Sequence, residues 1–202
     1  MRNDSIKVGV IGVGHLGQHH VKHYASIPNA ELIGVFDENY ERAKTIANSY
    51  GTIAFKDIDS LIIKTEAVSI VTPTKHHAKI SERCLLKNNH IFIEKPITKT
   101  LEEADRLLLL AEEKHCLIQV GHIERLNPAL TALNSFDLNP KFIEIQRLAP
   151  YTIRGTDVPV VLDLMIHDID ILLALVAFPV KEINATGLSI LTNSVDIAHA
   201  RI

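Results

Sequence analysis

Short apolar runs alternate with amphipathic segments along roughly the first 120 residues of the chain. The apolar runs are predicted strands, which cover residues 8–11, 31–36, 52–55, 67–71, 90–93 and 117–120. The amphipathic segments are predicted helices, which cover residues 15–26, 39–49, 57–63, 76–87 and 100–114. Continuously apolar strands that alternate with helices are typical of a parallel sheet buried on both faces. The pattern therefore predicts an α/β fold, a Rossmann doubly wound parallel sheet, in residues 1–121.

The hydrophobic pattern changes after Gly121 to that of an α+β domain. A short helix is predicted to open at Asn127 and Pro128, and a long, mostly apolar helix covers residues 158–177. The predicted strands cover residues 141–148, 180–191 and 195–202. We therefore expect residues 122–202 to form a second domain for substrate binding and oligomerisation, built on an open antiparallel sheet. The last predicted strand has no turn after it, so we expect this sheet to be truncated on its C-terminal side.

Composition narrows the class of protein. The chain has 202 residues, of which 47% are hydrophobic and 22% are charged, as in an ordinary globular protein. Its net charge of −3 lacks the basic signature of nucleic-acid binding, so no nucleic-acid partner is expected. Cys84 and Cys116 are too few for a disulfide framework and fit a reducing compartment. A strand follows the N-terminus almost directly, and the longest apolar run, residues 171–180, is about half a membrane span. These features predict a cytoplasmic protein with no membrane segment.

The first predicted strand runs into a glycine-rich turn with the spacing G-x-G-x-x-G. Gly12 would permit the tight turn, Gly14 would let the backbone approach a pyrophosphate, and Gly17 would let the next helix pack closely on the strand. The N-terminus of that helix would present N–H groups and partial positive charge to the phosphates. The bare motif also fits a glycine-rich turn that binds nothing.

An acidic residue, Asp37, ends the second predicted strand about 20 residues after the glycine motif. A carboxylate there can accept hydrogen bonds from both ribose hydroxyls of an adenosine, and it repels a 2′-phosphate. The first arginine to follow is Arg42. This arrangement favours NAD over NADP, with a helix-capping aspartate as the alternative.

Two further motifs end predicted strands at the edge where ligands bind in such folds. They are Thr72-Pro73-Thr74 and Glu94-Lys95-Pro96. A lysine at this edge can hydrogen-bond a substrate hydroxyl and stabilise the alkoxide that forms as a hydride leaves. A plain turn and a solvated strand end are the alternatives. His76 and His77 follow the first motif, and His77 is expected on the surface of its helix.

The predicted helix at residues 158–177 carries a narrow polar stripe. At 100° per residue, Asp163, His167 and Asp170 fall within about 60° of one another, and Asp168 points elsewhere. An aspartate beside a histidine suits a general base, because the carboxylate can orient or charge-stabilise the imidazole. A solvent-facing stripe on a half-buried helix is the alternative.

Histidine is abundant, with 11 residues in the chain. His15, His19 and His23 share one face of the first predicted helix, which raises the possibility of a metal site. No cysteine or carboxylate cluster accompanies them, so no metal is expected.

The chain resembles the Gfo/Idh/MocA oxidoreductase family in four motifs that occur in the same order. They are the glycine motif, Asp37, Thr72-Pro73-Thr74 and Glu94-Lys95-Pro96. Asp163 and His167 match the second signature of the family, and the resemblance covers essentially the whole chain. It implies a Rossmann domain that binds NAD and a Lys-Pro peptide that is often cis.

A closer resemblance is to the UDP-N-acetylglucosamine 3-dehydrogenases of this family. It lies in residues 121–128, 147–150 and 154–170. Enzymes of this subgroup oxidise the C3 hydroxyl of the sugar with NAD. A partner aminotransferase then aminates the 3-keto product, on the way to lipid A.

The resemblance implies a role for each candidate residue. The implied cofactor contacts are Gly12, Val13, Gly14, His15, Leu16, Gly17, Asp37, Thr72, Pro73, His76, Glu94, Lys95 and His122. The implied catalytic set is Lys95, Asp163 and His167. The candidates for binding the nucleotide-sugar are Arg125, Asn127, Tyr151 and Arg154. An arginine suits a diphosphate because it can bind it bidentately.

The chain departs from the family in length, since family members typically continue well beyond its last residue. A complete second-domain sheet would support a homo-oligomer. Two alternatives to a sugar-nucleotide dehydrogenase remain open from the sequence. One is a non-catalytic NAD-binding fragment or sensor, and the other is a family dehydrogenase that acts on a free sugar or an inositol.

Overall fold

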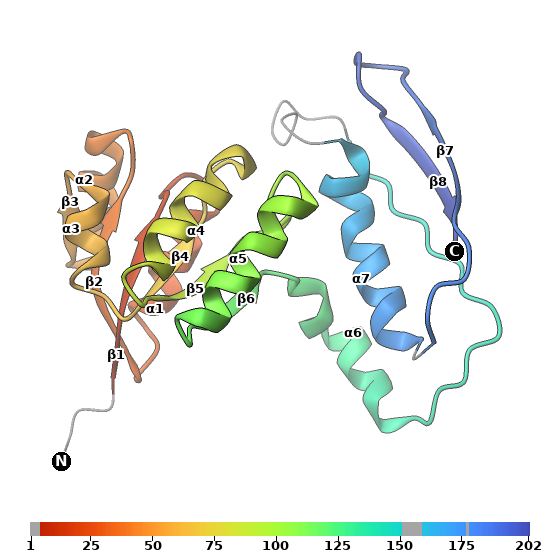
Figure 1. The fold of residues 1–202 in the computed structure, drawn as a ribbon, viewed down its shortest axis with the longest axis horizontal. Helices are drawn as coiled ribbons and strands as arrows, with labels where there is room; N and C mark the ends of the chain where they lie inside the picture. The colour runs from red at the N-terminus through yellow and green to blue at the C-terminus, as the bar shows by residue number, and fades with distance from the viewer. Residues whose placement is uncertain (1–4, 151–158, 177) are drawn as a thin grey trace. The chain divides into compact units, whose positions relative to one another are not determined.

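The computed structural model describes residues 5–150, 159–176 and 178–202 of the chain. The chain divides into two compact units, Met1–Gly121 and His122–Ile202 (Figure 1). The first unit holds a parallel sheet, and the second holds a small antiparallel sheet. Across the described ranges, no helix is long and apolar enough to cross a membrane.

The strands of the first unit form one six-stranded sheet in which every neighbouring pair is parallel. In spatial order they are β3 (Ile53–Phe55), β2 (Ala30–Phe36), β1 (Ile6–Ile11), β4 (Ala67–Ile70), β5 (His90–Ile93) and β6 (Ile118–Val120). This order confirms the predicted doubly wound α/β fold. Because the order reverses between β1 and β4, the carboxyl ends of these strands border the crevice where such sheets bind ligands.

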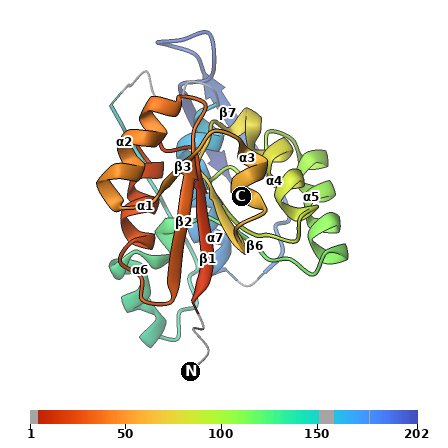
Figure 2. The ribbon, with the colours of Figure 1, turned by 90° about the vertical axis from the view of Figure 1, so that its left-hand side faces the viewer.

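The helices of the first unit connect these strands and cover both faces of the sheet. They are α1 (Gly17–Tyr24), α2 (Tyr40–Tyr50), α3 (Ile58–Ile62), α4 (His77–Leu85) and α5 (Leu101–Glu113). Figure 2 shows α1 and α2 on one face and α3, α4 and α5 on the other. Val10 belongs to the core cluster that includes Val21 of α1, and Ile11 to the cluster that includes Leu61 of α3. Successive strand residues thus serve opposite faces of the sheet.

Local capping contacts mark the starts of two helices, α2 and α5. The Asn39 side chain accepts a hydrogen bond from the Arg42 amide at 3.1 Å at the start of α2. Thr100 and Glu103 form a reciprocal capping box on α5, and each side chain accepts from the other residue's amide at 3.2 Å. Such caps satisfy N–H groups that lack intrahelical partners.

The second unit pairs one long helix with a two-stranded antiparallel sheet. Its described elements are α6 (Pro128–Thr131), α7 (Ile166–Leu175), β7 (Asn184–Leu188) and β8 (Ile197–Arg201), with 3₁₀ turns at Ile123–Leu126 and Ala132–Ser135 and a π-helical turn at Val161–Met165 before α7. Both strands are shorter than predicted. Between them, the Asp196 carboxylate accepts hydrogen bonds from the amides of residues 190–192 at 2.7–2.9 Å. Because their amides bind this carboxylate, residues 190–192 do not pair with β8, although the sequence pattern predicts a strand as far as residue 191.

The strand predicted at residues 141–148 is wrong. Within the described part of the chain, this segment has no strand conformation and pairs with no strand. Phe142 is 82% exposed, so the alternating pattern does not mark a buried face. Arg147 instead binds Asp168 through Nε at 2.8 Å and Glu124 through Nη1 at 3.4 Å. Alternation alone cannot make a strand, because a strand also needs a neighbour to pair with.

Candidate functional site

Two of the three motif glycines shape the turn between β1 and α1. Gly12 has a φ of +88°, and a Cβ there would lie 2.6 Å from the carbonyl oxygen of Val71. A Cβ on Gly17 would overlap the carbonyl oxygen of Gly12. A Cβ on Gly14 would meet no atom within 4 Å. The turn therefore needs Gly12 and Gly17 for its own backbone, whereas Gly14 leaves open space beside the loop.

The open space beside Gly14 fits the diphosphate of a dinucleotide. The first turn of α1 leaves N–H groups without intrahelical partners and carries the positive end of the helix dipole. Thr72, whose methyl group lies beside Gly12, has a buried hydroxyl with no hydrogen-bond partner among the described residues. A buried hydroxyl of this kind lacks a partner that a bound ligand can supply. The open space at Gly14 and the unpartnered Thr72 hydroxyl therefore fit a dinucleotide such as NAD.

Asp37, at the end of β2, has its carboxylate fully engaged by protein donors. Oδ1 accepts from the Asn39 amide at 2.8 Å and from Arg42 Nη2 at 2.7 Å. Oδ2 accepts from the Val13 amide at 2.9 Å and from Arg42 Nε at 3.1 Å. Burial raises the pKa of Asp37, but these hydrogen bonds and the Arg42 charge outweigh it and lower the pKa below its ordinary value. The sequence identifies the Asp37 carboxylate but does not show that Arg42 pairs with it.

Arg42 should weaken the preference for NAD, because it neutralises the carboxylate that would repel a 2′-phosphate. We expect Arg42→Ala to lower the affinity for NADP relative to NAD by about tenfold, since the Asp37 charge is then unmasked. Calorimetric titration with each cofactor measures the ratio. Arg83→Ala is a matched control, because Arg83 forms a partly exposed ion pair with Asp59 elsewhere in the unit. An unchanged ratio in Arg42→Ala would contradict this account.

His77, expected on the helix surface, is buried, and that prediction is wrong. The residue is 1% exposed. Its Nδ1 lies 2.9 Å from the carbonyl oxygen of Pro96, and its Nε2 lies 2.8 Å from that of Thr72. His77 thus ties the loop after β4 to the loop after β5, whereas His76 lies half buried in the 3₁₀ turn Thr74–His76.

Glu94 and Lys95 follow β5 at the same edge of the sheet, and the Lys95–Pro96 peptide is cis. Glu94 Oε1 lies 3.1 Å from Nε2 of His20, a residue of α1 that the sequence analysis did not single out. Because β1, β4 and β5 are neighbours in the sheet, their loops meet at one edge. The structure therefore brings together the glycine turn, Thr72 and the Glu94–Lys95 pair.

The predicted acid–histidine set lies in the second unit. Asp163 is in the π-helical turn and His167 is at the start of α7, and both are half buried. The 100° spacing does not hold across such a turn, in which hydrogen bonds span five residues. Asp170, which was assigned to the same stripe, is bound by Arg125 through Nε at 2.7 Å and Nη2 at 2.6 Å. Asp168 is held by Arg147, so the two aspartates anchor arginines.

Two predicted substrate residues have protein partners that the sequence did not reveal. Arg125 is the bidentate partner of Asp170, whose Oδ1 also lies 3.7 Å from Nδ1 of His122. Asn127 donates to Glu124 at 3.1 Å. This bond lowers the pKa of Glu124, helped by the charges of Arg147 and His167, although burial raises it. Glu124 therefore lies within electrostatic range of His167. The other two candidates, Tyr151 and Arg154, lie outside the described residues.

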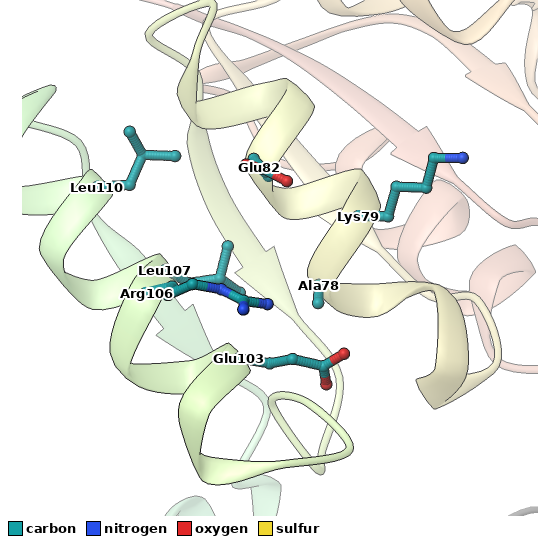
Figure 3. A pocket seen from close by; sticks show the side chains of 7 residues that line it. All are labelled: Ala78, Lys79, Glu82, Glu103, Arg106, Leu107 and Leu110. Atoms are coloured by element: carbon teal, nitrogen blue, oxygen red, sulfur yellow. The ribbon is translucent and has the colours of Figure 1, made fainter.

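Two hollows lie apart from the predicted site residues. One, of about 170 Å³, lies between α4 and α5. Its lining includes acidic and basic side chains, namely Lys79, Glu82, Glu103 and Arg106. Figure 3 shows Glu103 and Arg106 extending from α5 toward α4. The other, of about 380 Å³, is an apolar groove of the second unit among α7, β7 and β8. In the described ranges, no group of three or more His, Cys, Asp or Glu residues could hold a metal ion.

Comparison with known proteins identifies similar sequences and structures. Residues 6–122 match the model of the Gfo/Idh/MocA family, an oxidoreductase family with an NAD-binding Rossmann fold. The UDP-N-acetylglucosamine 3-dehydrogenase of Acidithiobacillus ferrooxidans is 42% identical over 196 residues, which cover 96% of this chain and 62% of that protein. A solved structure of that dehydrogenase, GnnA, matches with a TM-score of 0.92 over 97% of this chain and 64% of that chain.

Two further proteins extend the comparison. The glucose-6-phosphate 3-dehydrogenase of Bacillus subtilis is 31% identical over 133 residues, which cover 66% of this chain and 38% of that protein. GenD2 from gentamicin A biosynthesis, solved in complex with NAD, is 17% identical with a TM-score of 0.85, covering 98% of this chain and 62% of that one. This last likeness shows a shared fold. The chain spans about 62% of the length of the A. ferrooxidans relative.

Proposed function

Because the chain belongs to the Gfo/Idh/MocA oxidoreductase family, whose Rossmann domain binds NAD, we propose that it is an NAD-dependent dehydrogenase of a sugar hydroxyl. The proposed substrate is UDP-N-acetylglucosamine, oxidised at C3 to the 3-keto sugar. The strongest support for this substrate is the similarity of nearly the whole chain to a UDP-N-acetylglucosamine 3-dehydrogenase. The loops that meet at the carboxyl edge of β1, β4 and β5 also suit the binding of a dinucleotide beside a lysine.

Three residues have proposed roles at the reacting hydroxyl. NAD, when bound, supplies the acceptor for the hydride that leaves the sugar carbon. His167 takes the hydroxyl proton as general base, and Asp163 orients its imidazole or stabilises the imidazolium. Lys95 donates a hydrogen bond to the hydroxyl oxygen and stabilises the negative charge that develops there.

The remaining candidate residues would bind the cofactor and the substrate. Residues 12–17 would hold the pyrophosphate. Asp37 would bind the adenosine ribose, and to do so its carboxylate would give up its hydrogen bonds with Arg42 or accept from both groups. The proposed lining of the rest of the cofactor is Thr72, Pro73, His76, Glu94, Lys95 and His122. The proposed contacts to the nucleotide-sugar are Arg125, Asn127, Tyr151 and Arg154.

The proposed chemistry also implies a setting for the protein. A 3-keto sugar nucleotide is a substrate for an aminotransferase, which would lead toward an amide-linked lipid A. We infer a cytoplasmic location, because nucleotide-sugars and NAD are used there, and a homo-oligomer formed through the sheet of the second unit.

A panel of substrates tests the proposed function. Purified chain is incubated with NAD and each of several UDP-sugars, free sugars and inositols, and NADH absorbance is followed. UDP-N-acetylglucosamine is expected to give the highest rate. A higher rate with an inositol or a free sugar would make that compound the assigned substrate in place of UDP-N-acetylglucosamine. Calorimetric binding of NAD with no NADH from any compound would contradict catalysis and favour a non-catalytic NAD-binding protein.

A further inference from the structure

Glu94 is held at the sheet edge by a histidine that has no role in the proposed chemistry. Its Oε1 lies 3.1 Å from His20 Nε2, and the side chains of Glu94 and His20 are 21% and 18% exposed. On another side, a Cβ at Gly121 would lie 3.1 Å from both carboxylate oxygens. The carboxylate is thus enclosed between α1 and the residue that follows β6, which restricts its orientation.

His20 is itself held by the Ser69 hydroxyl, which in turn contacts the Tyr24 hydroxyl. Its Nδ1 lies 3.3 Å from Ser69 Oγ on β4, and that oxygen lies 2.9 Å from the hydroxyl of Tyr24. Ser69 is fully buried, so this contact replaces water. The ring also meets Phe92 edge-on, with the ring centroids 5.4 Å apart. Contacts on both nitrogens and on one side of the ring fix the direction in which His20 presents Nε2.

The contacts of His20 form one continuous hydrogen-bond network. An ionised Glu94 only accepts, so His20 donates to it from Nε2. At the other ring nitrogen, Nδ1 shares a hydrogen bond with the Ser69 hydroxyl, which in turn shares one with the Tyr24 hydroxyl. A continuous chain of hydrogen bonds therefore links Tyr24 at the end of α1 to the carboxylate at the sheet edge.

We propose that His20 is a positioning residue that acts through Glu94 on the nicotinamide end of the bound cofactor. The inference rests on the proposed function, in which Glu94 and Lys95 line that end. Without the His20 donor, the carboxylate turns toward other partners, and the adjacent Lys95 is displaced with it. Displacements of about 1 Å cost up to about 100-fold in rate, so we expect His20→Leu to lower kcat by about tenfold. The Kd for NAD should change by less than about threefold, because the proposed place of Glu94 is at the nicotinamide end, away from the phosphates and the adenosine.

Glutamine distinguishes positioning from simple packing. Its side-chain amide has one donor and one acceptor group, which can replace Nε2–H and Nδ1 between Glu94 and Ser69. We therefore expect His20→Gln to retain kcat within about threefold of the wild-type value, unlike His20→Leu. His23→Leu is the matched control, because His23 is exposed on the same helix. In a Glu94→Gln background, His20→Leu should have little further effect on kcat, since the two residues act as a unit.

The test measures kcat, the KM for NAD, the unfolding midpoint and the emission spectrum of bound NADH. The last reports the surroundings of the nicotinamide without turnover. A low kcat and an altered emission in His20→Leu, both restored in His20→Gln, are the expected result. Wild-type kcat and emission in His20→Leu, or equal losses in both variants, would overturn the inference.

Failure of the proposed function is separable from failure of this inference. If the wild-type chain oxidises none of the sugars, the proposed function fails, and the emission of bound NADH alone decides whether His20 positions Glu94. If His20→Leu does not fold, Ser69→Ala removes the hydroxyl that holds Nδ1. That variant should alter the emission of bound NADH, and a wild-type spectrum would overturn the inference.

Discussion

Replacing Lys95 by methionine is expected to lower turnover by about 10²–10⁴-fold, the range that a positioned acid–base or charge-stabilising group contributes. Methionine keeps most of the length of the side chain and removes its charge and its donors. NAD should still bind, because the glycine turn and Asp37 lie on other strands. Steady-state rates with UDP-N-acetylglucosamine, together with calorimetry of NAD, separate the two effects.

His167→Ala should give a loss in the same range, since the proposed general base is then absent. Lys99→Met is the matched control for Lys95→Met, because Lys99 is exposed a few residues further along the chain. It should keep the wild-type rate. Wild-type rates in both Lys95→Met and His167→Ala would exclude the assigned catalytic set.

Replacing Gly14 by alanine is expected to weaken NAD binding by about 100-fold, or about 2.7 kcal/mol, with no loss of stability. In the protein alone, a Cβ at Gly14 meets no atom within 4 Å, so the fold tolerates it. The methyl group would occupy the space through which the backbone approaches a pyrophosphate. Calorimetry gives the change in affinity, and urea unfolding gives the change in stability.

Gly17→Ala is the counterpart that affects the fold. A Cβ there overlaps the backbone carbonyl of Gly12, which cannot move aside as a flexible side chain can. We expect a loss of about 1–3 kcal/mol in the free energy of unfolding, the usual cost of overpacking. If Gly14→Ala also lowered stability, or if it left the affinity for NAD unchanged, the division of roles between these glycines would be wrong.

Much of the first unit could be predicted because its signals are local. Val10 and Ile11 are consecutive apolar residues in a strand buried on both faces, and each joins a different core cluster. Asn39 and the pair Thr100–Glu103 cap helices through contacts only three residues apart. Strand and helix periods, together with such caps, are short-range properties that the sequence displays directly.

The second unit was harder to predict because its hydrophobic pattern does not show which distant residues each segment will contact. Residues 141–148 alternate like a strand, yet no described strand pairs with them, and Arg147 binds Asp168 instead. The stripe on α7 was assigned with a regular helical angle, which the π-helical turn at Val161–Met165 breaks. A change of hydrogen-bond register inside a helix leaves little trace in the hydrophobic pattern.

The candidate site was predicted in part. The glycine turn, Thr72 and Glu94–Lys95 were identified because each ends a strand, and neighbouring parallel strands bring their ends to one edge. His77 was wrongly assigned to the helix surface and His20 was not singled out, although both lie close to these motifs in space. Their helix positions were visible, but nothing in the sequence shows which loop a buried helix face will meet.

The sequence by itself determined the order of strands and helices in the first unit, the glycine turn and the resemblance to NAD-dependent oxidoreductases. The tertiary structure alone decided which charged and polar side chains bind one another. Asp37 is held by Arg42, Glu94 by His20, and Asp170 by Arg125. The last two pairs join residues 74 and 45 positions apart in the chain. A periodic pattern shows only which face of an element is buried, whereas the partner of a polar group depends on where folding brings the rest of the chain.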